Sequence, residues 1–214
     1  MEKHPKQDFQ VERLAFFSDA VFAIVITLLI IEFKIPTVTK DSTLASVWEQ
    51  IYHLKSHLFA LLITFMLIVV YWSRHHLLFK HIHNYNKQIV IANMVTLLPI
   101  IFFPFTTAFV AESIVNEEIM PLAFRFYLLN HLAAALATFA LYWLAFVKYP
   151  DMSYEMTPEE KFKFYSDTLY STIMFLIILI VMSFTSNMIT IVSVTLFLAF
   201  FKKIIEMFLK KRLA

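Results

Sequence analysis

Arg13-Leu-Ala-Phe-Phe17-Ser18-Asp19 stands directly before an apolar run, residues 20–31, and this stretch decides the fold. The run has the character of a membrane-spanning helix. A carboxylate set this far into an apolar segment is costly, so Asp19 should have a polar partner or face water. Arg13 is nearly two helical turns away, which favours a partner from another helix. The alternatives are a simple cap near the helix start and a direct role in transport.

The composition of the chain indicates an integral membrane protein. Of its 214 residues, 60% are hydrophobic, and the mean hydropathy is +0.71; soluble domains have about 45–50% apolar residues. Cysteine and glycine are both absent, which excludes thiol chemistry, glycine-rich phosphate loops and carbonyl filters of the usual loop type. The net charge of +2 gives no support for a nucleic-acid partner. We expect no enzyme, no catalytic or metal-binding residue and no cofactor, and residues 1–9 do not resemble a signal peptide.

Apolar windows of membrane length predict a single all-α domain, residues 1–214, with six transmembrane helices. Pro36 closes the first window, and Pro99 and Pro104 predict a kink in the third. Thr157 and Pro158 predict the N-cap and first residue of a helix. The six windows cover residues 14–35, 54–72, 89–111, 122–147, 168–185 and 188–208.

The distribution of basic residues predicts the orientation. If the N-terminus is inside, 14 of the 18 Lys and Arg residues lie on the inner side. Inner loops of membrane proteins carry such an excess, so both termini should be cytoplasmic.

Two further patterns have ordinary explanations. Ile24, Thr27, Leu28 and Ile31 form a stripe on the first helix, which periodicity alone would assign to packing. The histidines that follow Trp72 suggest a metal site or proton sensor, but their spacing fits a wet helix extension better. Lys161-x-x-x-Tyr165-Ser166-Asp167 repeats the first motif without extending into neighbouring helices, so we interpret it as chance or convergent capping.

The run from Arg13 through Phe17-Ser18-Asp19 to Glu32 resembles the first helix of the transmembrane protein 175 family, whose signature is RxxxFSD. The resemblance implies a prokaryotic homotetramer with four first helices around a central pore. It implies a constriction at Ile24 and further pore-lining layers at Thr27, Leu28 and Ile31. It also implies that a network orients the first helix through Arg13, Phe17, Ser18, Asp19, Trp72 and His76, with His75 as the alternative to His76.

The resemblance therefore predicts a potassium-permeable cation channel in a prokaryotic plasma membrane, with lipid, monovalent cations and its own copies as partners. An isoleucine ring would gate by dewetting, a ring of Thr27 hydroxyls would replace part of the ion's hydration, and Glu32 would attract cations at the outer mouth. One rival hypothesis is a proton-coupled secondary transporter that uses Asp19 and a histidine. Another is an intramembrane enzyme or haem protein, for which His131 lacks a second histidine at matching depth.

Overall fold

The computed structural model describes residues 5–32 and 36–213, and nearly all of their regular structure is helical. The helices are α1 Pro5–Ile31, α2 Leu44–His81, α3 Lys87–Ile101, α4 Phe103–Ser113, α5 Met120–Trp143, α6 Pro158–Phe184 and α7 Met188–Leu213. A π-helical turn, Leu144–Lys148, and a 3₁₀ turn, Pro150–Met152, connect α5 to α6.

The six predicted segments are confirmed as helices, and the predicted kink divides the third into α3 and α4. Five helical stretches, with α3 and α4 counted as one, are long and apolar enough to cross a membrane. The sixth helix, α7, contains a shorter apolar stretch, Met188–Lys202. The predicted end of the first window at residue 35 lies outside the described residues.

Helix caps explain where several helices begin. Thr157 caps α6 in a reciprocal capping box with Glu160, and Pro158 follows at the first position, as the sequence predicts. Thr43 and Ser46 make the same box at the start of α2. The predicted start of α2 near residue 54 is therefore wrong, because the helix continues through polar residues beyond the apolar window.

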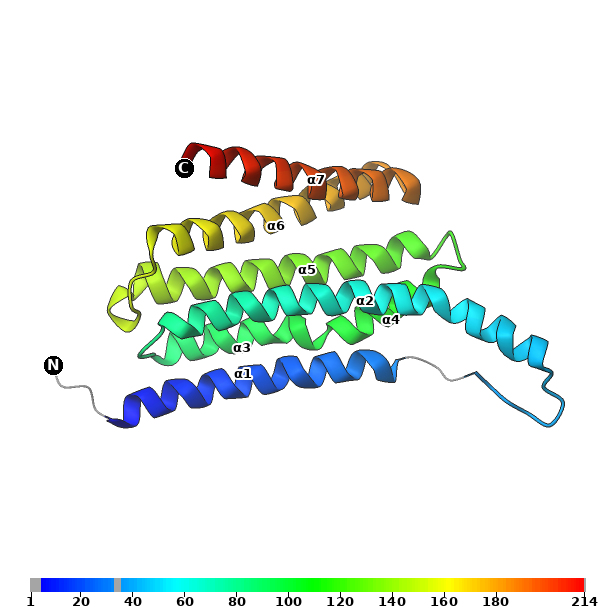
Figure 1. Ribbon diagram of the computed structural model, residues 1–214, viewed down its shortest axis with the longest axis horizontal. Helices are drawn as coiled ribbons and strands as arrows, with labels where there is room; N and C mark the ends of the chain where they lie inside the picture. The colour runs from blue at the N-terminus through cyan, green and yellow to red at the C-terminus, as the bar shows by residue number, and fades with distance from the viewer. Residues whose placement is uncertain (1–4, 33–35, 214) are drawn as a thin grey trace.

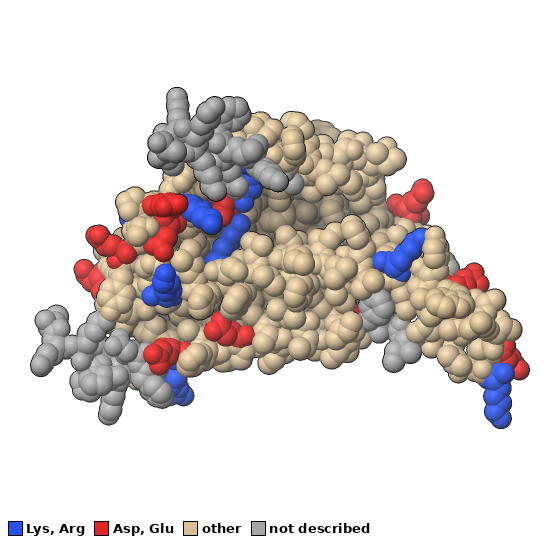
Figure 2. Space-filling view, viewed as in Figure 1, with Lys and Arg blue, Asp and Glu red and all other residues tan. Residues whose placement is uncertain are grey.

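The helices run roughly parallel or antiparallel to one another, with α1 at one edge of the bundle and α7 at the other (Figure 1). α1 packs against α2, α3 and α4, while α6 packs against α5 and α7. Both described ends of the chain lie at the same end of the bundle (Figure 1), as an even number of crossings requires. On the face shown in Figure 2, charged side chains gather mainly toward the two ends, which suits a protein surrounded by lipid.

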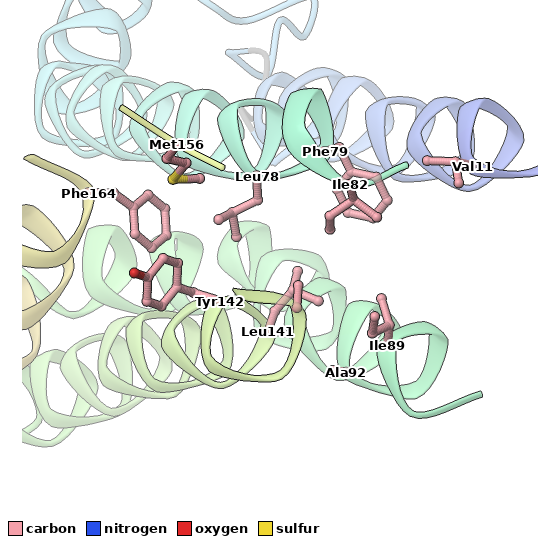
Figure 3. Packing of buried hydrophobic residues seen from close by; sticks show 11 residues of the cluster. Val11, Leu78, Phe79, Ile82, Ile89, Ala92, Leu141, Tyr142, Met156 and Phe164 are labelled. Carbon is pink, nitrogen blue, oxygen red and sulfur yellow. The ribbon is translucent and has the colours of Figure 1, made fainter. Parts of the chain in front are cut away.

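Three apolar clusters hold the bundle together. The first joins α1, α2, α3, α5 and α6 near the end of the bundle that holds the α2–α3 connection, and Leu78 and Leu141 lie between Val11 and Phe164 (Figure 3). The second packs Phe22, Val25 and Leu29 of α1 against α2, α3, α4 and α5. The third joins α5, α6 and α7. The second cluster sets which side of α1 turns inward and which side is left exposed.

Candidate functional site on the first helix

The first helix has one face packed against its own chain and one face exposed. Ser18, Phe22, Val25 and Leu29 recur at helical spacing and are buried. The predicted pore-lining residues lie on the other face: Ile24 is 57% exposed, Ile31 is 70% exposed, and Thr27 and Leu28 are also exposed. The stripe is therefore not packing within the chain, although periodicity alone would have assigned it so.

Thr27 keeps its hydroxyl oxygen available on this exposed face. Its Oγ1–H donates to the carbonyl of Ile24 at 2.7 Å. A hydroxyl whose proton is used in this way still has lone pairs to offer. The exposed face therefore presents an oxygen acceptor between two layers of aliphatic side chains.

Ser18 belongs to a buried polar network that joins three helices. Asn93 of α3 donates from Nδ2 to Ser18 Oγ at 2.9 Å, and its Oδ1 lies 2.7 Å from His75 Nε2 of α2. Ser18 Oγ also lies 3.0 Å from the carbonyl of Leu14. Ser18 and Asn93 are both fully buried. Because water cannot reach their polar groups, these hydrogen bonds satisfy them instead.

Asp19 is held by a separate contact with α2. The indole Nε1–H of Trp72 donates to Asp19 Oδ1 at 2.9 Å. His76 stacks on the ring of Trp72, with centroids 5.5 Å apart. The two histidines that the sequence left as alternatives thus have different places: His75 touches the Ser18 network through Asn93, and His76 lies against Trp72.

Arg13 and Phe17 lie apart from both contacts. They line an open groove of about 460 Å³ together with Gln10, Leu14, Tyr85 and Met94. Among the described side chains, Arg13 makes no hydrogen bond or ion pair, and Phe17 is exposed. The structure thus joins Ser18 to α3 through Asn93 and brings Asp19, Trp72 and His76 together between α1 and α2, but it leaves Arg13 and Phe17 outside these contacts.

Glu32 follows the last residue of α1, at the opposite end of the bundle from Arg13. It is exposed and lines a small cavity with His57 of α2 and Thr107 of α4. His57 Nε2 lies 3.8 Å from Glu112 Oε1. Acidic groups therefore gather where the exposed face of α1 ends.

Sequence reasoning missed Asn93, which links Ser18 to His75. The available signal was an amide in an apolar segment, because a buried amide needs partners. His131 was noticed only as a haem candidate. It is fully buried and lies against the rings of Tyr71, Phe103, Tyr127 and Phe175. No group of three or more His, Cys, Asp or Glu side chains in the described part of the chain could hold a metal ion.

These features define a helical membrane protein. Its first helix is oriented by polar contacts on one side and is exposed on the other. Residues 13–104 match the family model of the endosomal and lysosomal potassium channel TMEM175. The chain is similar to this family in sequence over that stretch, and its fold is similar to that of a solved TMEM175 homologue over most of its length.

Curated proteins and a solved structure are similar to the chain as well. The chain is 31% identical over 131 residues to a potassium channel of Streptomyces collinus and 36% identical over 124 residues to one of Chamaesiphon minutus. The matches cover 61% and 55% of this chain, and 62% and 57% of the two relatives. A crystal structure of a lysosomal potassium-selective channel TMEM175 homologue from Chamaesiphon minutus superposes with a TM-score of 0.73. That match has 25% identity and covers 90% of this chain and 95% of the other.

Proposed function

We propose that this protein is a potassium-permeable cation channel in a prokaryotic plasma membrane, with both termini in the cytoplasm. Four copies surround a central pore that is lined by α1. The observation that carries the proposal is the exposed face of α1, which bears Ile24, Thr27, Leu28 and Ile31 away from the core of its own chain. The names of the relatives, which are potassium channels, point to the same activity.

Symmetry explains how one helix suffices to form a pore. A single α1 encloses no space, but closed rotational symmetry repeats each side chain as a ring. Four Ile24 side chains form the narrowest ring, which blocks ions by excluding water until the helices tilt or rotate. Four Thr27 oxygens, with their protons turned to the Ile24 carbonyls, substitute for part of the hydration shell of potassium.

The polar contacts on the opposite side of α1 have a supporting role in this proposal. Ser18 and Asp19 bind α1 to α3 and α2, so they set the rotation at which Ile24 faces the axis. Glu32 raises the local cation concentration at the outer mouth. Arg13 and Phe17 act at the inner end of α1, beside the groove that they line.

The rival transporter mechanism has less support. It requires a proton path between Asp19 and a histidine. Asp19 instead accepts from Trp72, and His75 is hydrogen bonded to Asn93. No hydrogen bond between Asp19 and a histidine occurs among the described residues.

A combined subunit count and flux assay tests the channel proposal. Native mass spectrometry of the purified protein should give a tetramer, and liposomes containing it should pass potassium faster than sodium. Ile24→Ala should raise flux several-fold, because a smaller ring no longer excludes water, and Thr27→Val should reduce the preference for potassium. Phe22→Leu, on the buried face of the same helix, is the matched control. A monomer without flux, or equal flux in the wild type and Ile24→Ala, would contradict the proposal.

A further inference from the structure

The side chain of Arg74 projects from α2 on the side opposite that of Trp72. Two residues along an α-helix differ by about 200° around its axis, so side chains at positions 72 and 74 point in nearly opposite directions. Trp72 reaches Asp19 on α1. Arg74 reaches α6, in the segment that contains the second copy of the sequence motif.

The contacts of Arg74 converge on one residue of α6. Its terminal nitrogen donates to the backbone carbonyl of Asp167 at 3.2 Å and to Ser171 Oγ at 3.0 Å. Ser171 donates in turn to the same carbonyl at 2.7 Å. The carboxylate of Asp167 pairs with Lys202 of α7 at 2.9 Å. Asp167 therefore joins α2, α6 and α7.

Few other contacts join α2 to α6. α2 packs mainly against α1, α4 and α5, whereas α6 packs against α5 and α7. Among the residues that the structure describes, the other polar links between them lie at the end of α2, where Lys80 and His81 approach Glu160 at 3.8 and 3.5 Å. An arginine in a membrane segment must keep its donors bonded, so the contact of Arg74 holds the two helices at a defined separation.

We propose that Arg74 is a positioning residue for the first helix: the α6–α7 hairpin holds α2 through Arg74, and α2 holds α1 through Trp72 and Asp19. α6 and α7 pack mainly against other helices than α1, and the contacts of Arg74 and Trp72 form a polar route from them to α1 through α2. The effect on ion flux rests on the proposed function, but the effect on helix position does not.

The absence of cysteine allows the helix positions to be measured directly. Glu12→Cys on α1 and Glu159→Cys on α6 place spin labels on two exposed positions near the start of each helix. Labelled chains diluted with unlabelled ones give the distance within one chain by pulsed electron paramagnetic resonance. Arg74→Gln should shift and broaden this distance, and Arg74→Lys should restore it in part.

Arg125→Gln is the matched control. Arg125 also donates to a backbone carbonyl of α6, that of Met182 at 2.6 Å, but it does so from α5, which already packs along α6. This variant should leave the distance between α1 and α6 unchanged. An equal shift in both variants, or no shift in Arg74→Gln, would overturn the positioning role.

Two further measurements keep the outcomes separate. Ser171→Ala removes one acceptor of Arg74 and should move the distance in the same direction but less; if Arg74→Gln does not fold, an unmoved Ser171→Ala rejects the proposal. In liposomes, Arg74→Gln should lower the preference for potassium over sodium several-fold. If the wild type passes no potassium, only the channel proposal is overturned. The distances between the spin labels still test the role of Arg74.

Discussion

Phe17-Ser18-Asp19 on α1 and Tyr165-Ser166-Asp167 on α6 have nearly the same sequence but different surroundings. Ser18 is buried and bonded to Asn93, whereas Ser166 bonds back to the carbonyl of Lys163, one turn earlier on its own helix. Asp19 accepts from a neutral indole, whereas Asp167 pairs with a lysine. Of the two interpretations of the second copy, chance or convergent capping, capping is wrong, because Thr157 caps α6 well before it.

The neighbouring helix, rather than the motif itself, determines what the side chains of the motif do. α3 supplies an amide beside the first copy, and this amide makes the serine part of a buried network. α7 supplies a cation beside the second copy, and this cation makes the aspartate part of an ion pair. The buried network around Ser18 specifies one geometry. The ion pair between Asp167 and Lys202 tolerates more variation, because both charges are partly exposed.

Asn93→Ala should have the largest effect on the first copy. It leaves both Ser18 Oγ and His75 Nε2 without this partner in a buried site, where each unsatisfied group costs about 1–3 kcal/mol. We expect a loss of about 2–4 kcal/mol in the free energy of unfolding, measured by denaturant titration in mixed micelles. Asn130→Ala, which removes a single bond from Asn130 to the Pro99 carbonyl, should lose about 1 kcal/mol. Equal losses in the two variants would show that the network around Ser18 contributes no more to stability than a single amide hydrogen bond does.

The two aspartates should differ in their response to salt. Trp72→Phe removes the donor to Asp19 and should destabilise the protein by about 1–2 kcal/mol at any ionic strength. Asp167→Asn should cost about 0.5–1 kcal/mol at low salt and less at high salt, because a partly exposed ion pair is screened. Denaturant titration of both variants at about 0.05 M and about 1 M potassium chloride, where charges are screened weakly and strongly, measures the two losses. A salt-independent loss in Asp167→Asn would remove the distinction between the two copies.

The serines should show the smallest effects and the clearest contrast. Ser166→Ala removes only a local bond to the backbone and should change stability by less than about 0.5 kcal/mol. Ser18→Ala removes a partner of Asn93 and should cost about 1 kcal/mol. Thermal unfolding of the two variants side by side checks this, and a larger loss in Ser166→Ala than in Ser18→Ala would reverse the comparison.

Hydropathy predicted the number of helices, and prolines predicted the break between α3 and α4. The length of α2 was underestimated, because a window records where apolar residues end and not where helical hydrogen bonding ends. The capping box at Thr43 and Ser46 was the local signal for the true start.

The site was less accessible from sequence than the fold. Periodicity identified the stripe through Ile24 and Thr27 but not whether it faced its own chain, since both faces of α1 are apolar. Asn93 was missed because its partners, Ser18 and His75, are distant in sequence. The roles of Arg13 and Phe17 stay predictions, since the single chain leaves both on an open groove.

The break between α3 and α4 constrains how α1 can move. The carbonyl of Pro99 accepts both the backbone N–H of Phe102, at 3.2 Å, and the amide of Asn130 from α5, at 2.9 Å. A break in a helix is flexible when the backbone groups that lose their helical partner are bonded only to water or to nothing, but here a neighbouring helix bonds one of them, the carbonyl of Pro99. The bend is therefore a rigid corner against which Phe22 and Leu29 of α1 rest through Phe103. In the proposed channel, opening would therefore rotate α1 against α3 and α4, and the bend between these two helices would keep its shape.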